Sequence, residues 1–290
     1  MIHTLTPYIL QMCSSTNASK GVTYDEKSIS SKFNRQELAN LAWSCSVLRK
    51  YPEDLIPLLY TGLMGEDEES MDRLTRLYDD NGLQKKSIMS LLYVQMALDL
   101  EAPHLNMKLP PKLLESFSDQ DSRHESLERS SENELMLLST SKLQKSVSNV
   151  LEKIGFDHIQ EHVLGADDLQ AYGITLSSTA VNFLSIDIAD VESKIGVEVD
   201  GPSHFINILD EALGKTNKGK GSRVRTKSGK MWVFEWDGER QVNGPTALKD
   251  RLLAHLGWQI IHLPFWEWNN LNDEASQSTY CKELLNKAEE

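Results

Sequence analysis

Three carboxylates lie close together in residues 183–205, which read FLSIDIADVESKIGVEVDGPSHF. Asp187 belongs to one short apolar run, and Glu198 and Asp200 belong to a second. Isoleucine, leucine or valine alternates with other residues in both runs, which is typical of β-strands. A turn centred on residues 192–193 places the first acid directly opposite Glu198, and Asp200 lies two residues farther along the same face.

Three acids on one face of an apolar hairpin admit two explanations. The β-carbons of directly opposed residues are about 4.5–5.5 Å apart, so like charges there destabilise the sheet. A hard divalent cation, which prefers oxygen ligands, would be held by the acids and would neutralise them. Alternatively, water solvates the face, or an arginine or lysine side chain covers it. The spacing leaves both explanations open.

A cationic segment follows the acids, although the chain as a whole is acidic. It contains glycines and no acid, and its cations are Lys215, Lys218, Lys220, Arg223, Arg225, Lys227 and Lys230. A flexible basic segment suits contacts with nucleic-acid phosphates, which supply affinity that does not depend on sequence. The alternative is a disordered, solvated loop.

The composition is that of a folded chain with room for two domains. Of 290 residues, 40% are apolar and 25% are charged. The net charge of −13 and the pI of about 5.1 argue against nonspecific adhesion to nucleic acid by the whole chain. No run of 18 apolar residues is present, so no membrane span is expected. Three widely separated cysteines suggest a reducing compartment.

Periodicity divides the chain into four stretches. Residues 1–30 are weakly patterned, residues 31–116 read as helices, residues 117–137 form an acidic, serine-rich linker, and residues 138–290 alternate helices with strands. The first helix begins with a capping box at Asn34. Two more helices are expected at residues 54–64 and 87–100.

The last stretch contains the elements that must position the acids. A helix at 141–154 ends at Gly155, and further elements are a strand at 158–164, a strand at 230–236, a helix at 246–255 and a strand at 258–263. Core residues are expected at Leu252, Leu253, Ile260 and Ile261. Gly201 is expected to take backbone geometry that other residues resist.

Five of the six tryptophans lie in the last 60 residues: Trp232, Trp236, Trp258, Trp266 and Trp268. Aromatic side chains near a basic segment stack on nucleobases in some proteins, but tryptophan is more often a core residue. The sequence favours the core for each of them.

Three ordered sequence blocks resemble one known family. They are EVDGPSHF, NGPTALKDRLL and GWQIIHLPFWEW, and together they cover about residues 183–270. They resemble the RAP domain, an RNA-associated domain. RAP domains are similar to the restriction-endonuclease-like PD-(D/E)XK fold, which implies an α/β domain with a mixed sheet and flanking helices.

That resemblance implies roles for four residues. Asp187 and Glu198 match the first and second acids of the nuclease pattern, which would bind a metal ion. The third position, usually lysine, is Asp200 in this chain, which departs from the usual nuclease mechanism. His204 would be a substitute base, or alternatively a structural histidine beside a Gly-Pro turn. Whether the protein is an enzyme is therefore left open.

The all-helical N-terminal stretch carries a second resemblance. Its segment ELANLAWSCSVL resembles the helical repeats that precede RAP domains in FAST-kinase-like and octotricopeptide-repeat proteins. Such helix pairs present a concave surface to single-stranded RNA. One copy is recognisable, so the stretch is either a short array or a helical cap on the RAP domain.

The resemblance predicts an organellar RNA-binding protein that acts in RNA processing, stability, ribosome assembly or translation. Its partners would be single-stranded or ribosomal RNA and subunits of an organellar ribonucleoprotein, in the mitochondrion or alternatively the plastid. Two other functions stay open: a nuclease that uses Mg²⁺ or Mn²⁺, and a structural subunit of a particle such as the mitochondrial ribosome. Only the nuclease would need a cofactor.

Overall fold

The computed structural model describes residues 14–17, 21–24, 32–64, 82–109, 142–165, 169, 184–207, 222–225, 232–235 and 240–289. The predicted linker at 117–137 lies outside these residues, as does most of the weakly patterned N-terminal stretch. Among the described helices, none combines the length and the apolar character that crossing a membrane requires.

The described elements follow the predicted order of helices and then strands mixed with helices. Before the sheet domain they are β1 (Ser14–Asn17), β2 (Gly21–Tyr24), α3 (Arg35–Val47), α4 (Leu55–Met64), α6 (Gly82–Glu101) and the short η1 (Pro103–Leu105). The rest are α8 (Lys142–Lys153), β3 (Ile159–Val163), β4 (Ser185–Asp190), β5 (Ile195–Asp200), η3 (Pro202–His204), β6 (Phe205–Asn207), β7 (Ser222–Arg225), β8 (Trp232–Glu235), β9 (Arg240–Val242), α10 (Gly244–His255), β10 (Gln259–Pro264), α11 (Phe265–Asn269) and α12 (Glu274–Glu289).

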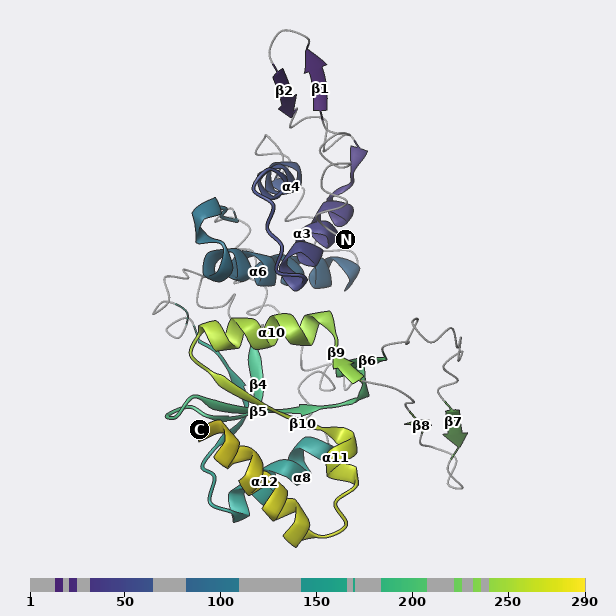
Figure 1. Cartoon of the computed structure of the whole chain (residues 1–290), viewed down its shortest axis with the longest axis vertical. Coiled ribbons are helices and arrows are strands. Elements are labelled where there is room, and N and C mark those ends of the chain that lie inside the picture. Colours follow the sequence, from purple (N-terminus) through teal and green to yellow (C-terminus); the bar gives the residue numbers. More distant parts are fainter. Residues whose placement is uncertain are drawn as a thin grey trace, which may run out of the picture.

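A four-stranded mixed sheet forms the centre of the C-terminal part, in the order β10-β5-β4-β3. β10 runs parallel to β5, whereas β4 is antiparallel to both β5 and β3. Figure 1 shows α10 on one face of this sheet and α8 with α12 on the other. The predicted fold class, a mixed α/β sheet with flanking helices and helices before it, is therefore confirmed.

Each face of the sheet buries its own apolar core. Under α8 and α12, Val197, Val199 and Leu263 pack with apolar side chains from the two helices. Under α10, Leu252 and Leu253 are fully buried, as predicted. Of the two predicted core isoleucines, Ile261 is buried and Ile260 is half-buried, because alternation along β10 turns them to opposite faces.

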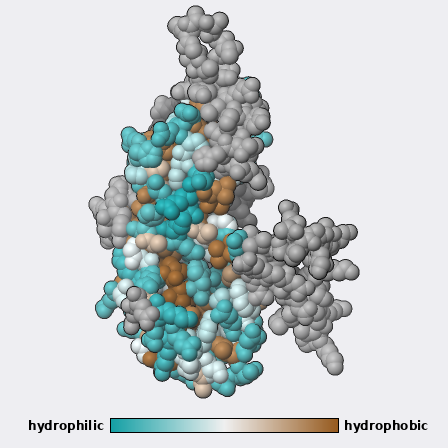
Figure 2. Space-filling model, in the orientation of Figure 1, coloured by the Kyte–Doolittle hydropathy of each residue, from teal (hydrophilic) through white to brown (hydrophobic). Residues whose placement is uncertain are grey.

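The N-terminal helices and α10 share one apolar core. Buried side chains of α3, α4 and α6 belong to the same cluster as those of α10 and of β4. The approach is close at Gly244, where an added β-carbon would lie 2.5 Å from Cγ1 of Val47. The outer surface is mostly hydrophilic on the face that Figure 2 shows, with hydrophobic residues in separate patches. The helical region is therefore packed onto the sheet domain.

Local signals placed several helix ends correctly. The Asn34 side chain accepts from the Glu37 amide (2.9 Å) and the Glu37 side chain accepts from the Asn34 amide (2.8 Å), which confirms the capping box. α8 ends at Lys153, and Gly155 has a φ of +86°, in the left-handed region that favours glycine. The prediction for Gly201 was wrong: its φ is −76° and its ψ 175°, which other residues adopt readily.

Candidate functional site

The predicted register of the β4–β5 hairpin is confirmed, but its ladder ends one residue early. Ile188 pairs with Val197, and the two following pairs continue the same register toward the turn. At the next position Asp187 does not continue the ladder; instead its Oδ2 accepts a hydrogen bond from the backbone amide of Val199 (2.8 Å). The predicted alternation of β4 is also interrupted at Asp187. Ile186 packs into the core on one face of the sheet, and Ile188 packs into the core on the opposite face.

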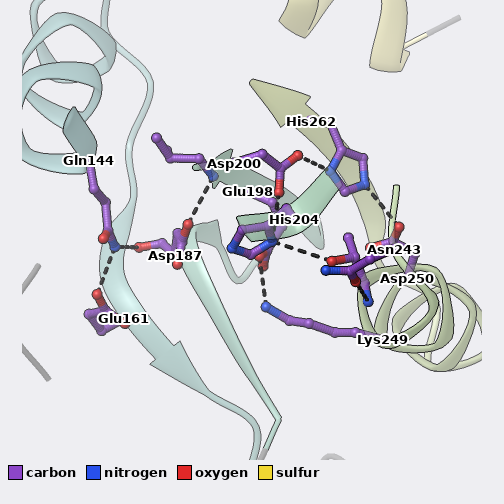
Figure 3. A network of polar contacts seen from close by, with 12 residues as sticks. Gln144, Glu161, Asp187, Glu198, Asp200, His204, Asn243, Lys249, Asp250 and His262 are labelled. Atoms are coloured by element: carbon purple, nitrogen blue, oxygen red, sulfur yellow. Dashed lines mark hydrogen bonds and ion pairs between the residues drawn. The ribbon is translucent and has the colours of Figure 1, made fainter. Parts of the chain in front are cut away.

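A side chain of α8 contacts β4 where the ladder is interrupted at Asp187. Gln144 is buried and donates to the backbone carbonyl of Asp187 (3.0 Å) and to Oε1 of Glu161 (2.8 Å). Glu161 has a φ of 51°, which is uncommon for a residue other than glycine. Figure 3 shows Gln144 pointing toward both acids. The distortion orients the Asp187 carboxylate toward the backbone of β5.

Glu198 is neutralised by a lysine from α10. Its side chain is buried, with the residue 3% exposed, and its Oε2 accepts a hydrogen bond from Lys249 Nζ (2.7 Å). This is the second explanation offered by the sequence, in which a cationic side chain covers the acids. Oε1 of Glu198 is also buried, and no described residue donates a hydrogen bond to it.

Asp200 is neutralised by two histidines. It is fully buried, and its Oδ2 lies 2.6 Å from Nδ1 of His262 while its Oδ1 lies 3.1 Å from Nδ1 of His204. The other nitrogen of His262, Nε2, lies 3.1 Å from Oδ2 of Asp250. His262 thus bridges two carboxylates, from β5 and α10 (Figure 3).

These interactions set the charges of the site. Burial, followed by the nearby Glu198 charge, raises the pKa of Asp187 to about 6. Burial would lower the pKa of His262, but hydrogen bonds to Asp200 and Asp250 outweigh it and raise this pKa to about 10. Burial would raise the pKa of Asp200, but the interactions with both histidines outweigh it and lower this pKa. The interaction with Asp200 in turn raises the pKa of His204.

α10 supplies one side of the site because three of its polar residues share a face. Thr246, Lys249 and Asp250 are spaced i, i+3 and i+4, which is one face of a helix. The start of this helix is fixed by Asn243, whose Oδ1 accepts from the Thr246 amide (2.9 Å) and whose Nδ2 donates to the Ser203 carbonyl (2.6 Å). The cap therefore joins α10 directly to the turn after β5.

The site residues that were not predicted from the sequence include Gln144, Lys249, Asp250 and His262. The i, i+3, i+4 spacing was the available signal for α10, and a histidine within the apolar strand QIIHLP was the signal for β10. Asp187, Glu198, Asp200 and His204, which were predicted, all lie in this network (Figure 3).

The two proposed metal ligands, Asp187 and Glu198, are each partly engaged by the protein itself, and their role as metal ligands stays a prediction. One oxygen of Glu198 is paired with Lys249, and one oxygen of Asp187 accepts the Val199 amide. In the part of the chain that is described, no three His, Cys, Asp or Glu side chains are grouped as a metal site requires. The cations that balance the acids here are side chains of the protein itself.

The predicted phosphate-binding cations cannot be placed by their side chains. Lys215, Lys218, Lys220, Lys227 and Lys230 lie outside the described residues, and for Arg223 and Arg225 the structure describes only the backbone of β7. β7 pairs with β8 in an antiparallel hairpin. The role of these seven residues stays a prediction.

Comparison with known families tests the resemblance directly. The family model of the RAP domain matches residues 197–284. This chain carries a RAP domain. The match begins within β5 and ends within α12, so the RAP domain contains Glu198, Asp200 and His204 as well as all of α10 and β10. Asp187 and Gln144 precede the matched residues.

A curated relative extends the similarity beyond the RAP domain. It is a "RAP domain-containing protein, chloroplastic" from Oryza sativa subsp. japonica, and it is 25% identical over 254 residues. The alignment covers 87% of this chain and 30% of the relative. The chain thus spans about a third of the length of the rice protein. The helices before the RAP domain are included in the aligned length, because 254 residues exceed the RAP match.

Proposed function

We propose that this protein is an organellar RNA-binding protein, and that its RAP domain binds the RNA. The observation that carries the proposal is the RAP match at residues 197–284, because the RAP family is generally associated with RNA binding. The rice relative is described as chloroplastic, which favours the plastid over the mitochondrion for this chain. The proposal includes a role in RNA processing, RNA stability, ribosome assembly or translation.

The charges of the site are compatible with a bound polyanion. Three buried or half-buried acids, Glu198, Asp200 and Asp250, would repel phosphates if they were unpaired. They are paired instead with Lys249, His262 and His204, which lie within 3.1 Å of them. The C-terminal edge of the sheet is therefore close to neutral despite the net charge of −13.

The topology attaches the cationic segment to that same edge. β6 and β9 are antiparallel partners, and Asn207 pairs with Arg240 at the end of the ladder. The chain between these residues, 208–239, contains all seven predicted phosphate-binding cations. The chain that contains the cationic segment therefore begins after β6 and ends before β9, and these two strands are neighbours.

Removing the cations is expected to weaken RNA binding and its dependence on salt. We expect a chain with Lys218, Lys220, Arg223, Arg225 and Lys227 changed to alanine to bind labelled single-stranded RNA more weakly, because each bound phosphate releases counterions. The slope of log K against log salt should fall in magnitude by about 0.7 for each phosphate that the variant no longer binds. Fluorescence anisotropy at several salt concentrations measures both quantities.

A matched control separates a local role from net charge. The control changes the same number of charges, five, on α8 and α12. The lysines changed to alanine are exposed: Lys142, Lys145, Lys153, Lys282 and Lys287. This control should retain nearly the affinity and slope of the parent. Equal losses of affinity in both variants would refute a specific role for the cationic segment.

A nuclease is the second candidate, and the buried Glu198 favours it. Its Oε1 has no hydrogen-bond donor among the described residues, and Asp187 nearby has a pKa of about 6. A buried carboxyl whose pKa is raised beside a second acid is a common feature of active sites. These residues do not supply a complete nuclease mechanism, because Asp200 replaces the usual lysine and Glu198 is paired with Lys249.

Glu198→Gln tests the nuclease candidate. If the protein cleaves RNA, this variant should lose at least about tenfold in cleavage rate, because the change removes the charge that Lys249 neutralises and alters the paired acid. End-labelled RNA on denaturing gels, with and without Mg²⁺, measures the rate. Glu274→Gln, in an exposed pair with Lys153, is the control. Equal cleavage by parent and Glu198→Gln excludes Glu198 from catalysis.

A structural subunit of an organellar ribosome stays as an alternative within the RNA-binding proposal. Co-sedimentation with ribosomal particles at moderate salt separates a bound subunit from a free processing factor.

A further inference from the structure

One cation of the candidate site lies beside a residue for which the sequence predicted a metal ion. Nζ of Lys249 lies 2.7 Å from Oε2 of Glu198, the second predicted metal ligand. The Glu198 side chain is 4% exposed and that of Lys249 is 20% exposed, so salt and water screen this ion pair only weakly. The ammonium group therefore neutralises the acid from within the protein (Figure 3).

The helix that carries Lys249 is fixed relative to the end of β5. The amide of Asn243, the N-cap of α10, donates to the His204 carbonyl (2.7 Å), and its side-chain Nδ2 donates to the Ser203 carbonyl (2.6 Å). Leu248, the residue before Lys249, is fully buried in the core that α10 shares with β4. A side chain on a fixed helix loses little conformational entropy in forming its ion pair, so the ammonium group is preorganised.

Glu198 has a second oxygen that the ion pair leaves unused. Its Oε1 is buried, and no described residue donates a hydrogen bond to it. A buried carboxylate oxygen is costly unless it accepts a hydrogen bond or lies against a cation. Glu198 therefore has capacity for a cation beyond the contact that Lys249 makes.

A divalent cation and the ammonium group would compete for this carboxylate. A metal ion bound by Glu198 would lie roughly 2.0–2.6 Å from its oxygens, and Nζ of Lys249 lies 2.7 Å from one of them. Two cations this close repel each other strongly where water is scarce. Displacement of Nζ would in turn deprive the Lys249 charge of its partner. The ion pair therefore opposes metal binding at Glu198.

We propose that Lys249 is a built-in counter-ion of this RAP domain: its ammonium group occupies the cation position at Glu198, and Mn²⁺ or Mg²⁺ binds there only by displacing it. The domain thereby keeps a buried acid neutral with its own side chain. The inference goes beyond the proposed function, because it concerns the charge of the site and not the RNA. It favours RNA binding over metal-dependent cleavage as the activity of the parent chain.

Lys249→Met tests the proposal, because methionine keeps a long unbranched side chain and removes the charge. Isothermal titration calorimetry with Mn²⁺ alone measures binding to the full chain. We expect Lys249→Met to bind Mn²⁺ at least about tenfold more tightly than the parent. Mn²⁺ should also raise the melting temperature of the variant more than that of the parent, because a ligand that binds only the folded chain stabilises it.

Two further variants are the controls. Lys145→Met removes an exposed lysine from α8 and should bind Mn²⁺ as the parent does. The double variant Lys249→Met with Glu198→Gln removes both charges of the ion pair, so it should fold and should lose the Mn²⁺ binding that Lys249→Met gains. It also separates Glu198 from the other acids of a chain whose net charge is −13. Circular dichroism establishes that each variant is folded.

Each outcome decides the proposal. Tighter Mn²⁺ binding by Lys249→Met that the double variant loses supports the built-in counter-ion. Equal Mn²⁺ affinities of parent and folded Lys249→Met, or no binding by either, would overturn it, as would a gain that the double variant retains. If Lys249→Met does not fold, Lys249→Gln, which is neutral and keeps a hydrogen-bond donor, replaces it in the same titration. These measurements use no RNA, so their failure leaves the proposed RNA-binding function standing, and a parent that binds no RNA would refute only that function.

Discussion

Replacement of Arg251 by alanine is expected to lower the free energy of unfolding by about 3 kcal/mol at pH 7. Arg251 lies on α10, and its Nε donates to Oε1 of Glu101 at the end of α6 (2.9 Å). The Glu101 side chain is 1% exposed. The variant would leave the buried Glu101 charge with the more distant Arg49 (3.5 Å) and the Tyr51 hydroxyl, which compensate it less well, so the expected loss exceeds that of a surface pair.

Arg251 also satisfies the end of a helix. Its guanidinium donates to the carbonyl oxygens of Ser46 (2.6 Å) and Val47 (3.3 Å), in the last turn of α3. Carbonyls at a helix C-terminus have no partner within the helix, so the guanidinium supplies the donor that the helix lacks. One side chain therefore joins α3, α6 and α10, and its removal should loosen the helical region from the RAP domain.

The effect of Arg251→Ala should depend on pH. Burial would raise the pKa of Glu101, but hydrogen bonds from Arg251 and Tyr51 outweigh it and lower this pKa below the ordinary value of 4.5. A lowered pKa stabilises the fold above the ordinary value, and this stabilisation disappears as the pH falls through the folded value. The difference in unfolding free energy between parent and variant should be at its maximum above pH 4.5 and should decrease below it.

Urea denaturation at several pH values measures this difference. Arg251→Lys should cost an intermediate amount, since an ammonium cannot reach Glu101 and two carbonyls with the same geometry. The control is Lys153→Ala, which breaks an exposed pair with Glu274 (2.7 Å) and should cost less than about 1 kcal/mol. A cost for Arg251→Ala no larger than that of Lys153→Ala would contradict the interpretation of a buried pair.

His262→Gln is expected to cost about 3–5 kcal/mol near pH 6. His262 lies 2.6 Å from Asp200 and 3.1 Å from Asp250, and glutamine cannot carry the charge that both acids require. Asp200 would keep its ion pair with His204, whereas Asp250 would be deprived of the ion pair that it makes with His262. The variant should retain the fold, but with weaker packing between β5, β10 and α10.

The pH dependence of His262→Gln should be opposite to that of Arg251→Ala. The pKa of His262 is raised from 6.5 to about 10. A raised pKa stabilises the fold fully below the ordinary value of 6.5, and this contribution is lost as the pH rises through 10. The difference in unfolding free energy between parent and variant should therefore be largest at about pH 6 and should close between pH 6.5 and 10.

Two measurements check this expectation. Denaturation curves from about pH 6 to 10 give the difference in stability, and imidazole chemical shifts should show His262 still protonated at about pH 8. His104→Gln is the control, because His104 is exposed and lies 3.7 Å from an exposed Glu53. A His262 that titrates near its ordinary pKa of 6.5 would refute the bridge between the two carboxylates.

Local sequence signals determined the parts of this protein that depend on neighbours in the chain. The hairpin turn and its register were predicted because alternation in two adjacent runs leaves few ways to bury both. The cap at Asn34 and the stop at Gly155 were predicted because side-chain hydrogen bonds and positive φ are local requirements. The three ordered sequence blocks indicated the RAP domain by their resemblance to that family, and the family model matches residues 197–284.

The tertiary structure alone decided which cations meet the acids. Lys249 is 51 residues from Glu198, and His262 is 62 residues from Asp200. They meet because β10 pairs in parallel with β5 and α10 covers the face between them, a crossover that no local pattern specifies. The break in β4 at Asp187 likewise needs Gln144 from α8, 43 residues away.

Exposure of the tryptophans was decided in the same way. Trp266 and Trp268 are two residues apart in α11, yet Trp268 is buried and Trp266 remains at the edge beside Phe205. Composition could not separate them, because both are aromatic residues in one apolar block. A helix turns by about 200° over two residues, so neighbours this close face nearly opposite ways, and the packing of α11 against the sheet decides which one is covered.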